Sequence, residues 1–294
     1  ILIDTAGSVT LSSSVTFSPA TKMEINNGGI LKPNAFTFTF NSGAFYCFSG
    51  GTVLAGGLFR TQNTVTLNIR TGSAFNSALN VNTGTTTAGE FSSPYNGRFY
   101  GNLTIENGAT LSTNNSSAYD TEFYGTVTNN GLISGSGHFI LRGSSLINNN
   151  SITSVYFALN STCNVSGAGS FTSNHILIDT NASVTLLSNL TFSPVSTLDM
   201  LTGGTLNPNS NVFNLNSGTF EVSSGAVVSN SGTFRTQGTV TLNIRNGSSF
   251  NAPLNVTSGN TQAYEASSPY DARLYGNITI DNGASLDLGN SPSY

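Results

Sequence analysis

A long internal repeat constrains what this chain can fold into more than any other feature of its sequence. The stretch "ILIDTAGSVTLSSSVTFSP" from Ile1 returns as "ILIDTNASVTLLSNLTFSP" from Ile176, an offset of 175. Residues 1–119 match residues 176–294 at this offset without an insertion or a deletion. Such a register is typical of stacked repeats, in which one added residue would misplace every layer above it. We therefore predict two repeat units, 1–175 and a truncated 176–294.

A shorter phrase inside each unit predicts the fold. Two apolar strands flank a polar turn in "MEINNGGIL" (23–31), "LNIRTGSAF" (67–75) and "LTIENGATL" (103–111), and such phrases recur about every 20 residues, the length of one β-helix coil. An Asn-Gly turn also suits a type I′ hairpin, and therefore an antiparallel sandwich or barrel. The number of turns, the lack of matched hairpin partners and the gap-free repeat favour coils. We predict an all-β, right-handed parallel β-helix (β-solenoid) with about nine coils per 175-residue unit.

The two copies indicate which side chains point inward. Positions that stay apolar in both copies are predicted to line the interior, and positions that change among polar types, such as Thr39 and Thr71, are predicted to face solvent. Asn in the turns suits a left-handed backbone and can form hydrogen-bonded ladders from coil to coil. The predicted inward positions are Phe38, Phe40, Phe45, Leu67, Ile69, Phe75, Ile105 and Leu111, with Phe213, Leu215, Phe220, Leu242, Ile244, Phe250, Ile280 and Leu286.

The composition excludes several classes of partner. Charged residues make up 7% of the chain, against about 25% in an average soluble protein, and the net charge is −4. No basic stripe is available for nucleic acid or for anionic lipid. No apolar run approaches the ~18 residues that would span a bilayer, so we expect no membrane insertion.

The sequence contains no familiar catalytic or metal-binding signature. The thirteen acidic residues are scattered, no D-x-D or E-x-x-E pair occurs, and no G-x-S-x-G motif is present. His138 and His175 do not form a zinc signature with Cys47 and Cys163. Because Val222 replaces Cys47 in the second copy, we predict two unpaired core cysteines. We expect no catalytic residue, no metal site and no cofactor, and therefore no enzyme activity.

One repeated phrase interrupts the apolar alternation for longer than a corner requires. It is "SSPYNGRFYG" (92–101) in the first copy and "SSPYDARLYG" (267–276) in the second, and we expect its surroundings, 82–101 and 257–276, to bulge outward. The residues that we take as a candidate partner- or glycan-binding loop are Glu90, Tyr95, Arg98, Tyr100, Glu265, Tyr270, Arg273 and Tyr275.

Two interpretations of this loop remain open at the level of sequence. Tyr faces with Arg and Glu suit a sugar or a protein partner. Alternatively, Glu90 pairs with Arg98 to close the loop, and the Tyr rings cover the apolar wall beneath. A partial third version, "SSAYDTEFYG" (116–125), keeps the frame but carries Glu122 where Arg98 would stand. The aromatic and glycine positions of the phrase persist, whereas the charge at the position of Arg98 is reversed. This pattern favours the architectural interpretation.

The phrases "NLTIENGATL" (102–111) and "GTVTNNGLISGSG" (125–137) resemble the repeats of very large secreted bacterial adhesins. The likeness is to adhesins with filamentous-haemagglutinin-like β-helices and to the giant cell-surface appendages of Bacteroidota. It implies an extracellular structural or adhesive rod segment at the cell surface, which packs against sister chains in a homo-oligomeric filament and contacts cell-surface glycans. The chain begins without Met, and "SPSY" at its end starts the loop phrase again, so we expect a piece of a longer secreted protein.

Two other functions are consistent with the same fold. A polysaccharide-binding or polysaccharide-cleaving β-helix needs a cleft with carboxylates from neighbouring coils. An ice-binding face needs regular outward rows of Thr-x-Thr, as in "TVTLN" (64–68), although the second copy does not keep all of these Thr positions.

Overall fold

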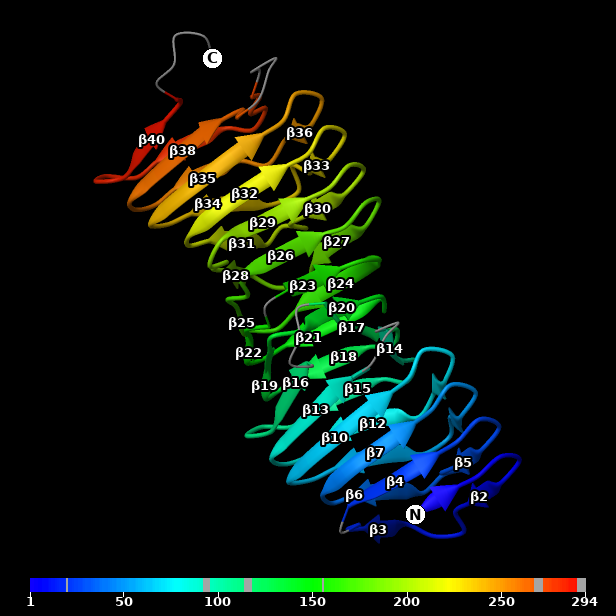
Figure 1. The fold of residues 1–294 in the computed structure, drawn as a ribbon. Helices are drawn as coiled ribbons and strands as arrows, with labels where there is room; N and C mark the ends of the chain where they lie inside the picture. The colour runs from blue at the N-terminus through cyan, green and yellow to red at the C-terminus, as the bar shows by residue number, and fades with distance from the viewer. Residues whose placement is uncertain (20, 92–95, 114–117, 155, 267–271, 290–294) are drawn as a thin grey trace. The chain divides into compact units, whose positions relative to one another are not determined.

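The structure is a computed structural model that describes residues 1–19, 21–91, 96–113, 118–154, 156–266 and 272–289. It is all-β: a parallel β-solenoid of about 12 coils with turns of about 22 residues (Figure 1). Contacts divide the chain into two units, residues 1–146 with 153–155, and residues 147–152 with 156–294. The two units are defined by spatial contacts, whereas the repeat units are defined by sequence similarity. The division into repeat units 1–175 and 176–294 therefore stays a prediction.

Each coil of unit 1 contributes one strand to each of three parallel sheets. The first sheet has the order β1 (Leu2–Ile3), β4 (Lys22–Ile25), β7 (Gly43–Cys47), β10 (Thr64–Ile69), β13 (Thr85–Gly89), β16 (Thr110–Thr113), β19 (Leu132–Gly135). The second has the order β2 (Ser8–Thr10), β5 (Ile30–Lys32), β8 (Thr52–Val53), β11 (Ala74–Phe75), β14 (Asn96–Phe99), β17 (Asp120–Phe123), β20 (His138–Leu141). The third has the order β3 (Val15–Phe17), β6 (Thr37–Phe40), β9 (Leu58–Thr61), β12 (Ala78–Val81), β15 (Leu103–Ile105), β18 (Val127–Asn129).

Unit 2 is built in the same way, and β21 (Ser145–Asn148) crosses the boundary between the units along the chain. Its first sheet has the order β22 (Ser151–Ile152), β25 (Ser170–Phe171), β28 (Leu190–Phe192), β31 (Val212–Leu215), β34 (Thr233–Thr236), β37 (Leu254–Val256), β39 (Ile278–Ile280). Its second has the order β23 (Tyr156–Leu159), β26 (His175–Ile178), β29 (Thr197–Met200), β32 (Gly218–Val222), β35 (Thr239–Ile244), β38 (Asn260–Tyr264), β40 (Ser285–Asp287). Its third has the order β24 (Thr162–Ser166), β27 (Ser183–Leu186), β30 (Thr205–Asn207), β33 (Val227–Val228), β36 (Ser249–Phe250).

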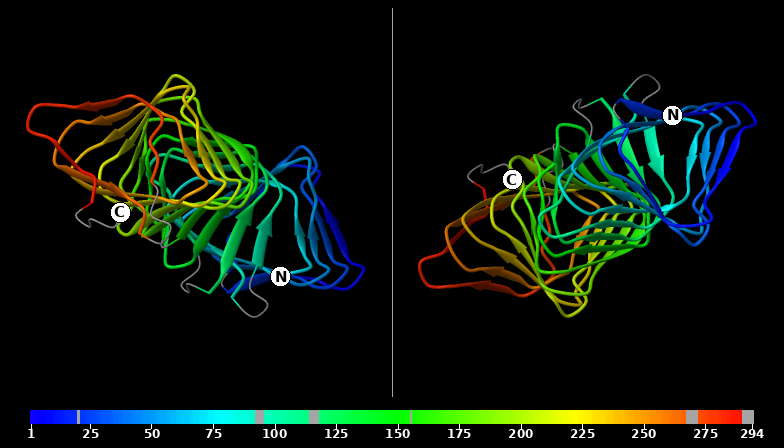
Figure 2. Two further views of the ribbon diagram at one scale, coloured as in Figure 1. Left: turned by 90° about the horizontal axis from the view of Figure 1, so that it is seen from above. Right: turned by 90° about the horizontal axis from the view of Figure 1, so that it is seen from below.

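The parallel pairing excludes the hairpin alternative within the described residues. Strand β7 pairs in parallel with β4 on one side and with β10 on the other, so that Phe45 lies opposite Met23 and Leu67. A strand therefore pairs with the strand one coil away and not with the strand after its own turn. Seen from above and below (Figure 2), the coils of each unit surround a common interior.

The strand bounds recur at the offset that the sequence shows, since β10 begins at Thr64 and β35 at Thr239. Strand β35 is the twenty-fifth strand after β10. Because each coil has three strands, 175 residues span eight coils and one further strand. The expectation of nine coils per 175 residues was therefore too high. The reason is that a coil takes about 22 residues and not about 20.

Corner glycines connect successive coils through backbone hydrogen bonds. The amide of Gly28 donates to the Gly50 carbonyl (3.0 Å), and the amide of Gly50 donates to the Gly72 carbonyl (2.9 Å). The three glycines have φ of 77°, 80° and 84°, a backbone region that other L-residues rarely adopt. Gly225 donates to Gly247 in the same manner in the second copy (3.0 Å).

The predicted Asn ladder is present at another corner. Asn63 Nδ2 donates to Asn41 Oδ1 (3.0 Å), and Asn41 Nδ2 donates to Ser18 Oγ (3.1 Å). Asn63 has a φ of 57°, as expected for Asn in a turn. Side-chain amides therefore extend the backbone pairing around this corner.

Phenylalanine rings fill the interior of each unit. In unit 1, Phe59 lies next to Phe75 (5.2 Å between ring centroids), Phe75 next to Phe99 (5.2 Å), and Phe99 next to Phe123 (5.2 Å). In unit 2, Phe192 stacks on Phe213 at 4.7 Å. Rings from successive coils thus form continuous columns, which are favourable for burial and for aromatic contact.

The predicted inward positions are buried, with two exceptions in the second copy. Ile280 is 48% exposed and Leu286 is half-buried, because no described coil covers β39 and β40 on their far side. One predicted solvent position was also wrong: Thr39 is 6% exposed, because Thr16 and Arg60 flank it in register on the neighbouring coils.

Both cysteines are free and buried, as predicted. Burial raises the pKa of the Cys47 and Cys163 thiols to about 12 from 9.0. Above pH ~9 the unfolded chain loses these thiol protons while the folded chain keeps them. The unfolded state then binds fewer protons, so stability falls as the pH rises from about 9 towards about 12.

We expect Cys47→Val to flatten this alkaline loss of stability. Each thiol contributes a slope of at most ~1.4 kcal/mol per pH unit. Valine fits, because Val222 is fully buried at the equivalent position. The measurement is urea unfolding of both proteins at several pH values between about 8 and about 12. Parallel curves of unfolding free energy against pH would contradict the prediction.

Candidate binding site

The candidate loop residues lie partly in the described chain. Tyr95 and Tyr270 lie outside the described residues. Glu90 follows β13 and is 1% exposed. Its Oε2 accepts hydrogen bonds from the Thr71 amide (2.9 Å), the Thr71 hydroxyl (2.6 Å) and the Asn96 amide (3.0 Å). Glu90 therefore holds the corner after β10, and it is not displayed to a partner.

Arg98 pairs with a carboxylate on the next coil, which corrects the expected pairing with Glu90. Strands β14 and β17 place Arg98 opposite Glu122, and Arg98 Nε donates to Glu122 Oε2 at 2.9 Å. Arg142 also donates to Glu122 Oε1, from Nε at 2.9 Å and from its terminal NH2 at 2.7 Å. The Glu122 side chain is 2% exposed, between two arginines that are 38% and 32% exposed.

Two tyrosines complete this group, which we name the Glu122 cluster (Arg98, Tyr100, Glu122, Tyr124 and Arg142). The Tyr124 hydroxyl donates to Glu122 Oε2 at 2.8 Å. Tyr100, 40% exposed, stacks on Tyr124 with 4.9 Å between ring centroids. The Arg142 guanidinium lies 6.0 Å from the centre of the Tyr124 ring. An exposed ring and two guanidinium groups therefore surround one buried carboxylate.

The electrostatics of the cluster follow from that carboxylate. Burial lowers the pKa of Arg98 and Arg142, but hydrogen bonding and attraction to Glu122 outweigh burial, and both pKa values are raised. Burial raises the pKa of Tyr124, and its hydrogen bond to Glu122 raises it further. The two guanidinium groups thus keep their charge, and Tyr124 keeps the hydroxyl proton that it donates to Glu122.

The second copy repeats the corner that Glu90 holds in the first. Glu265 is 3% exposed, and its Oε1 accepts from the Asn246 amide at 2.8 Å, as Glu90 accepts from Thr71. Arg273 is exposed, and Tyr275 is 59% exposed. The position equivalent to Glu122 would be 297, and this sequence has 294 residues.

A second charged group lies on the second sheet of unit 2, across β26, β29, β32 and β35 (Figure 1). Asp199 and Glu221 lie directly opposite each other on adjacent strands. His175 Nε2 lies 2.7 Å from Asp199 Oδ2, and Asn243 Nδ2 donates to Glu221 Oε2 at 2.6 Å. A terminal nitrogen of Arg245 lies 3.4 Å from Glu221 Oε2. Carboxylates from neighbouring coils therefore do meet.

A hollow of about 340 Å³ opens beside these side chains. Its lining residues are Thr197, Asp199, Leu201, Glu221, Ser223 and Arg245, which we name the Asp199 groove. Sequence reasoning missed this site, because its residues are scattered singly along the chain. The available signal was the spacing of 22 between Asp199 and Glu221, which is one coil.

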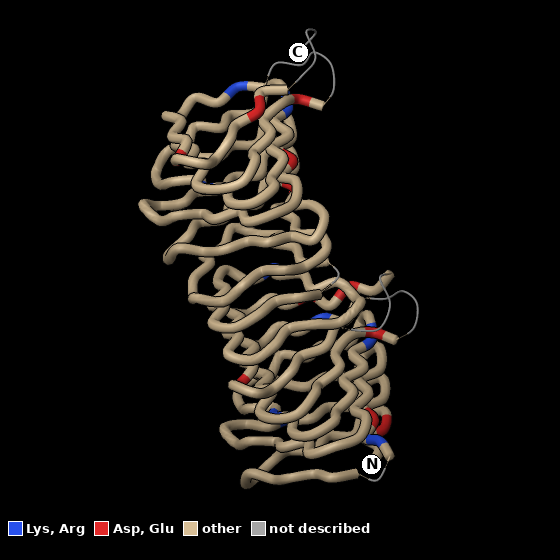
Figure 3. Tube along the Cα trace, turned by 90° about the vertical axis from the view of Figure 1, so that its left-hand side faces the viewer, with Lys and Arg blue, Asp and Glu red and all other residues tan. Residues whose placement is uncertain are grey.

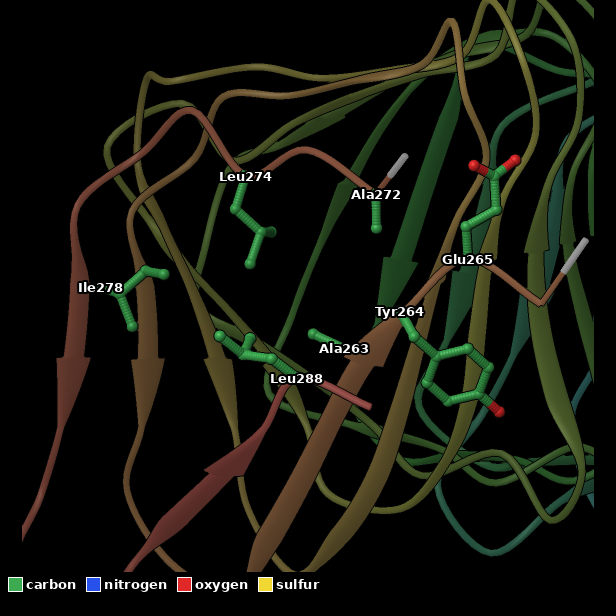
Figure 4. A pocket seen from close by; sticks show the side chains of 7 residues that line it. All are labelled: Ala263, Tyr264, Glu265, Ala272, Leu274, Ile278 and Leu288. Carbon is green, nitrogen blue, oxygen red and sulfur yellow. The ribbon is translucent and has the colours of Figure 1, made fainter. Parts of the chain in front are cut away.

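A cavity of about 330 Å³ lies at the last described coil, where Leu274, Ile278 and Leu288 line it with Glu265 (Figure 4). In the first copy, the residue equivalent to Leu274 is Phe99, and Phe123 of the next coil stacks on it at 5.2 Å. The cavity therefore lies where a further coil packs in the first copy, and we assign no binding site to it.

Outward threonines form a small array on the first sheet of unit 1. Thr66 and Thr87 lie in register on β10 and β13, and Ser112 follows on β16. In the second copy, Gln262 stands in place of Thr87. The array of Thr66, Thr87 and Ser112 thus spans three neighbouring coils, and the second copy does not keep all of its threonines.

Charged residues are sparse along the Cα trace (Figure 3). Among the described residues, no group of three or more His, Cys, Asp and Glu side chains could hold a metal ion. His138 instead contacts Asp120, with 2.8 Å between Nδ1 and Oδ1. No helix of the described chain is long and apolar enough to cross a bilayer.

Comparisons of this chain with protein-family models, with curated proteins and with solved structures found no match.

Proposed function

We propose that this chain is a structural and adhesive rod segment of a long extracellular filament at a cell surface, and that it has no enzyme activity. The observation that carries the proposal is the repetition: parallel coils recur strand for strand, with glycine-bonded corners and columns of phenylalanine inside. A solenoid of this kind can be lengthened by adding coils, because each coil contacts only its neighbours. The resemblance to large secreted bacterial adhesins supports the same function.

The surface chemistry also supports attachment. Hydroxyl side chains form outward columns, such as Thr66 with Thr87. Because few residues of the chain are charged, little electrostatic repulsion opposes contact with a sister chain. The Glu122 cluster adds an exposed ring, Tyr100, next to Arg98. Aromatic and arginine side chains are those that contribute most to protein interfaces. The partners proposed here are sister chains and cell-surface glycans.

Attachment of coated beads tests this proposal. We expect beads that carry the chain to attach to one another or to glycan-coated surfaces more than albumin-coated beads do. Arg98→Ala with Tyr100→Ala should reduce attachment several-fold, because it removes the exposed part of the Glu122 cluster. The matched control is Lys22→Ala with Glu24→Ala, an exposed ion pair on another sheet, with melting temperatures measured for all proteins. Attachment no greater than that of albumin beads would refute the adhesive function.

A polysaccharide-binding or polysaccharide-cleaving protein is the second candidate function. The observation that favours it is the Asp199 groove, where two carboxylates from neighbouring coils, Asp199 and Glu221, lie in register. Paired carboxylates are the groups that glycoside hydrolysis uses. Incubation with a glycan panel tests cleavage, and unchanged chain lengths would refute the cleaving form.

A further inference from the structure

The first copy of the repeat shows what the Asp199 groove lacks. Tyr46 and Phe48 stand at the positions equivalent to Glu221 and Ser223, and their rings are stacked with 6.0 Å between centroids and 11° between planes. Arg70, the equivalent of Arg245, lies over the Phe48 ring at 5.3 Å. In the first copy, two stacked aromatic rings therefore occupy this place on the surface, and a guanidinium group lies over one of them.

The second copy keeps the arginine and removes both rings. Arg245 remains, whereas Glu221 and Ser223 are too small to fill the space, and a hollow of about 340 Å³ results. The strands that carry these residues have the same bounds at an offset of 175, since β7 spans 43–47 and β32 spans 218–222. The hollow thus follows from side-chain replacement on strands with the same bounds.

The charge of the site changes as well. In the first copy, Lys22 Nζ donates to Glu24 Oε1 at 2.8 Å. Thr197 replaces that lysine in the second copy, so that Asp199, the equivalent of Glu24, has no lysine beside it. Asp199 Oδ1 is buried and has no hydrogen-bond partner in the described chain. A buried acceptor without a donor carries the cost of an unmade hydrogen bond.

The lining combines the groups that recognise a sugar. Carboxylate oxygens of Asp199 and Glu221 accept from hydroxyl groups, and Arg245 donates to them. Leu201, which replaces Asn26 of the first copy, adds an apolar side chain for the C–H face of a ring. The two carboxylates, with the Arg245 guanidinium group and the His175 imidazole beside them, disfavour an anionic ligand.

We infer that the Asp199 groove binds one neutral pyranose ring of a glycan, in the place that Tyr46 and Phe48 fill in the first copy. This inference deepens the second candidate function and rests on it; it does not depend on the adhesive rod. It assigns binding to Asp199, Glu221, Ser223 and Arg245, with no cleavage step.

The deciding experiment fills the groove with the side chains of the first copy. Calorimetric titration compares the wild-type chain with the double variant Glu221→Tyr, Ser223→Phe, using maltohexaose, cellohexaose, mannohexaose and chitohexaose as neutral probes and the hexamer of polygalacturonate as the anionic probe. We expect at least one neutral hexaose to bind the wild-type chain, and the double variant to bind it about tenfold more weakly or less.

Two further variants keep the test decisive. Asp199→Asn has the same shape as the wild type and should also weaken binding, even if the double variant folds poorly. Tyr46→Glu with Phe48→Ser should create a second binding site in the first copy and raise the stoichiometry. The inference is overturned if no neutral hexaose binds, if wild type and double variant bind equally, or if the anionic hexamer binds more tightly. Bead attachment is measured separately, so the failure of either proposal leaves the other to be judged on its own result.

Discussion

Phe40→Ala is expected to lower the free energy of unfolding by about 3–5 kcal/mol, the usual cost of truncating a fully buried aromatic side chain. Phe40 is fully buried at the end of β6, with ring centroids of Phe45 at 5.9 Å and Phe59 at 6.3 Å. Removing the ring leaves a void that two rigid coils do not close, because the backbone pairing fixes their separation. Urea unfolding followed by circular dichroism measures the change.

The matched control is Phe40→Leu. The second copy carries Leu215 at this position, and that side chain is also fully buried. We therefore expect Phe40→Leu to cost only about 1 kcal/mol. Equal losses for Phe40→Ala and Phe40→Leu would show that the interior of unit 1 tolerates voids, contrary to the close packing that the structure indicates.

Glu122→Gln is expected to lower the free energy of unfolding by about 2–3 kcal/mol, with little change in side-chain shape. The carboxylate of Glu122 accepts from Arg98, Arg142 and Tyr124. A glutamine amide presents one oxygen and one NH2 group, so that a donor would face another donor. The loss stays below that of a fully buried ion pair, because both arginines keep about a third of their side chains exposed.

Asp120→Asn in the same strand is the control for Glu122→Gln. The Asp120 side chain is 32% exposed and contacts His138, so its replacement should cost less than about 1 kcal/mol. Thermal unfolding of the two variants in parallel compares the buried carboxylate with the exposed one. A larger loss for Asp120→Asn than for Glu122→Gln would contradict the role given to the Glu122 cluster.

Much of the fold could be predicted from sequence, because the interior repeats a simple pattern. Apolar residues such as Phe45 and Leu67 keep their type in both copies, and their alternation predicts strands with one face inside. The coil length was predicted less well, about 20 residues against about 22, because the phrases do not mark where a corner ends. Handedness stays a prediction.

The candidate site was predicted only in part. The sequence singled out Glu90 and Arg98 as a pair within one loop, whereas Glu90 holds a corner and Arg98 contacts Glu122. The charge inversion in "SSAYDTEFYG" was the available signal, since 24 residues separate Arg98 from Glu122. Opposite charges at equivalent places on neighbouring coils indicate pairing, because parallel strands align equivalent residues.

The sequence by itself determined that this chain forms stacked coils with an apolar interior, because alternation and a gap-free repeat are local properties of the chain. Only the tertiary structure decided which surface side chains meet. Arg98 reaches Glu122 after 24 residues and Asp199 reaches Glu221 after 22, since each corner has its own length. The register between coils thus depends on the corners, and both the Glu122 cluster and the Asp199 groove are products of that register.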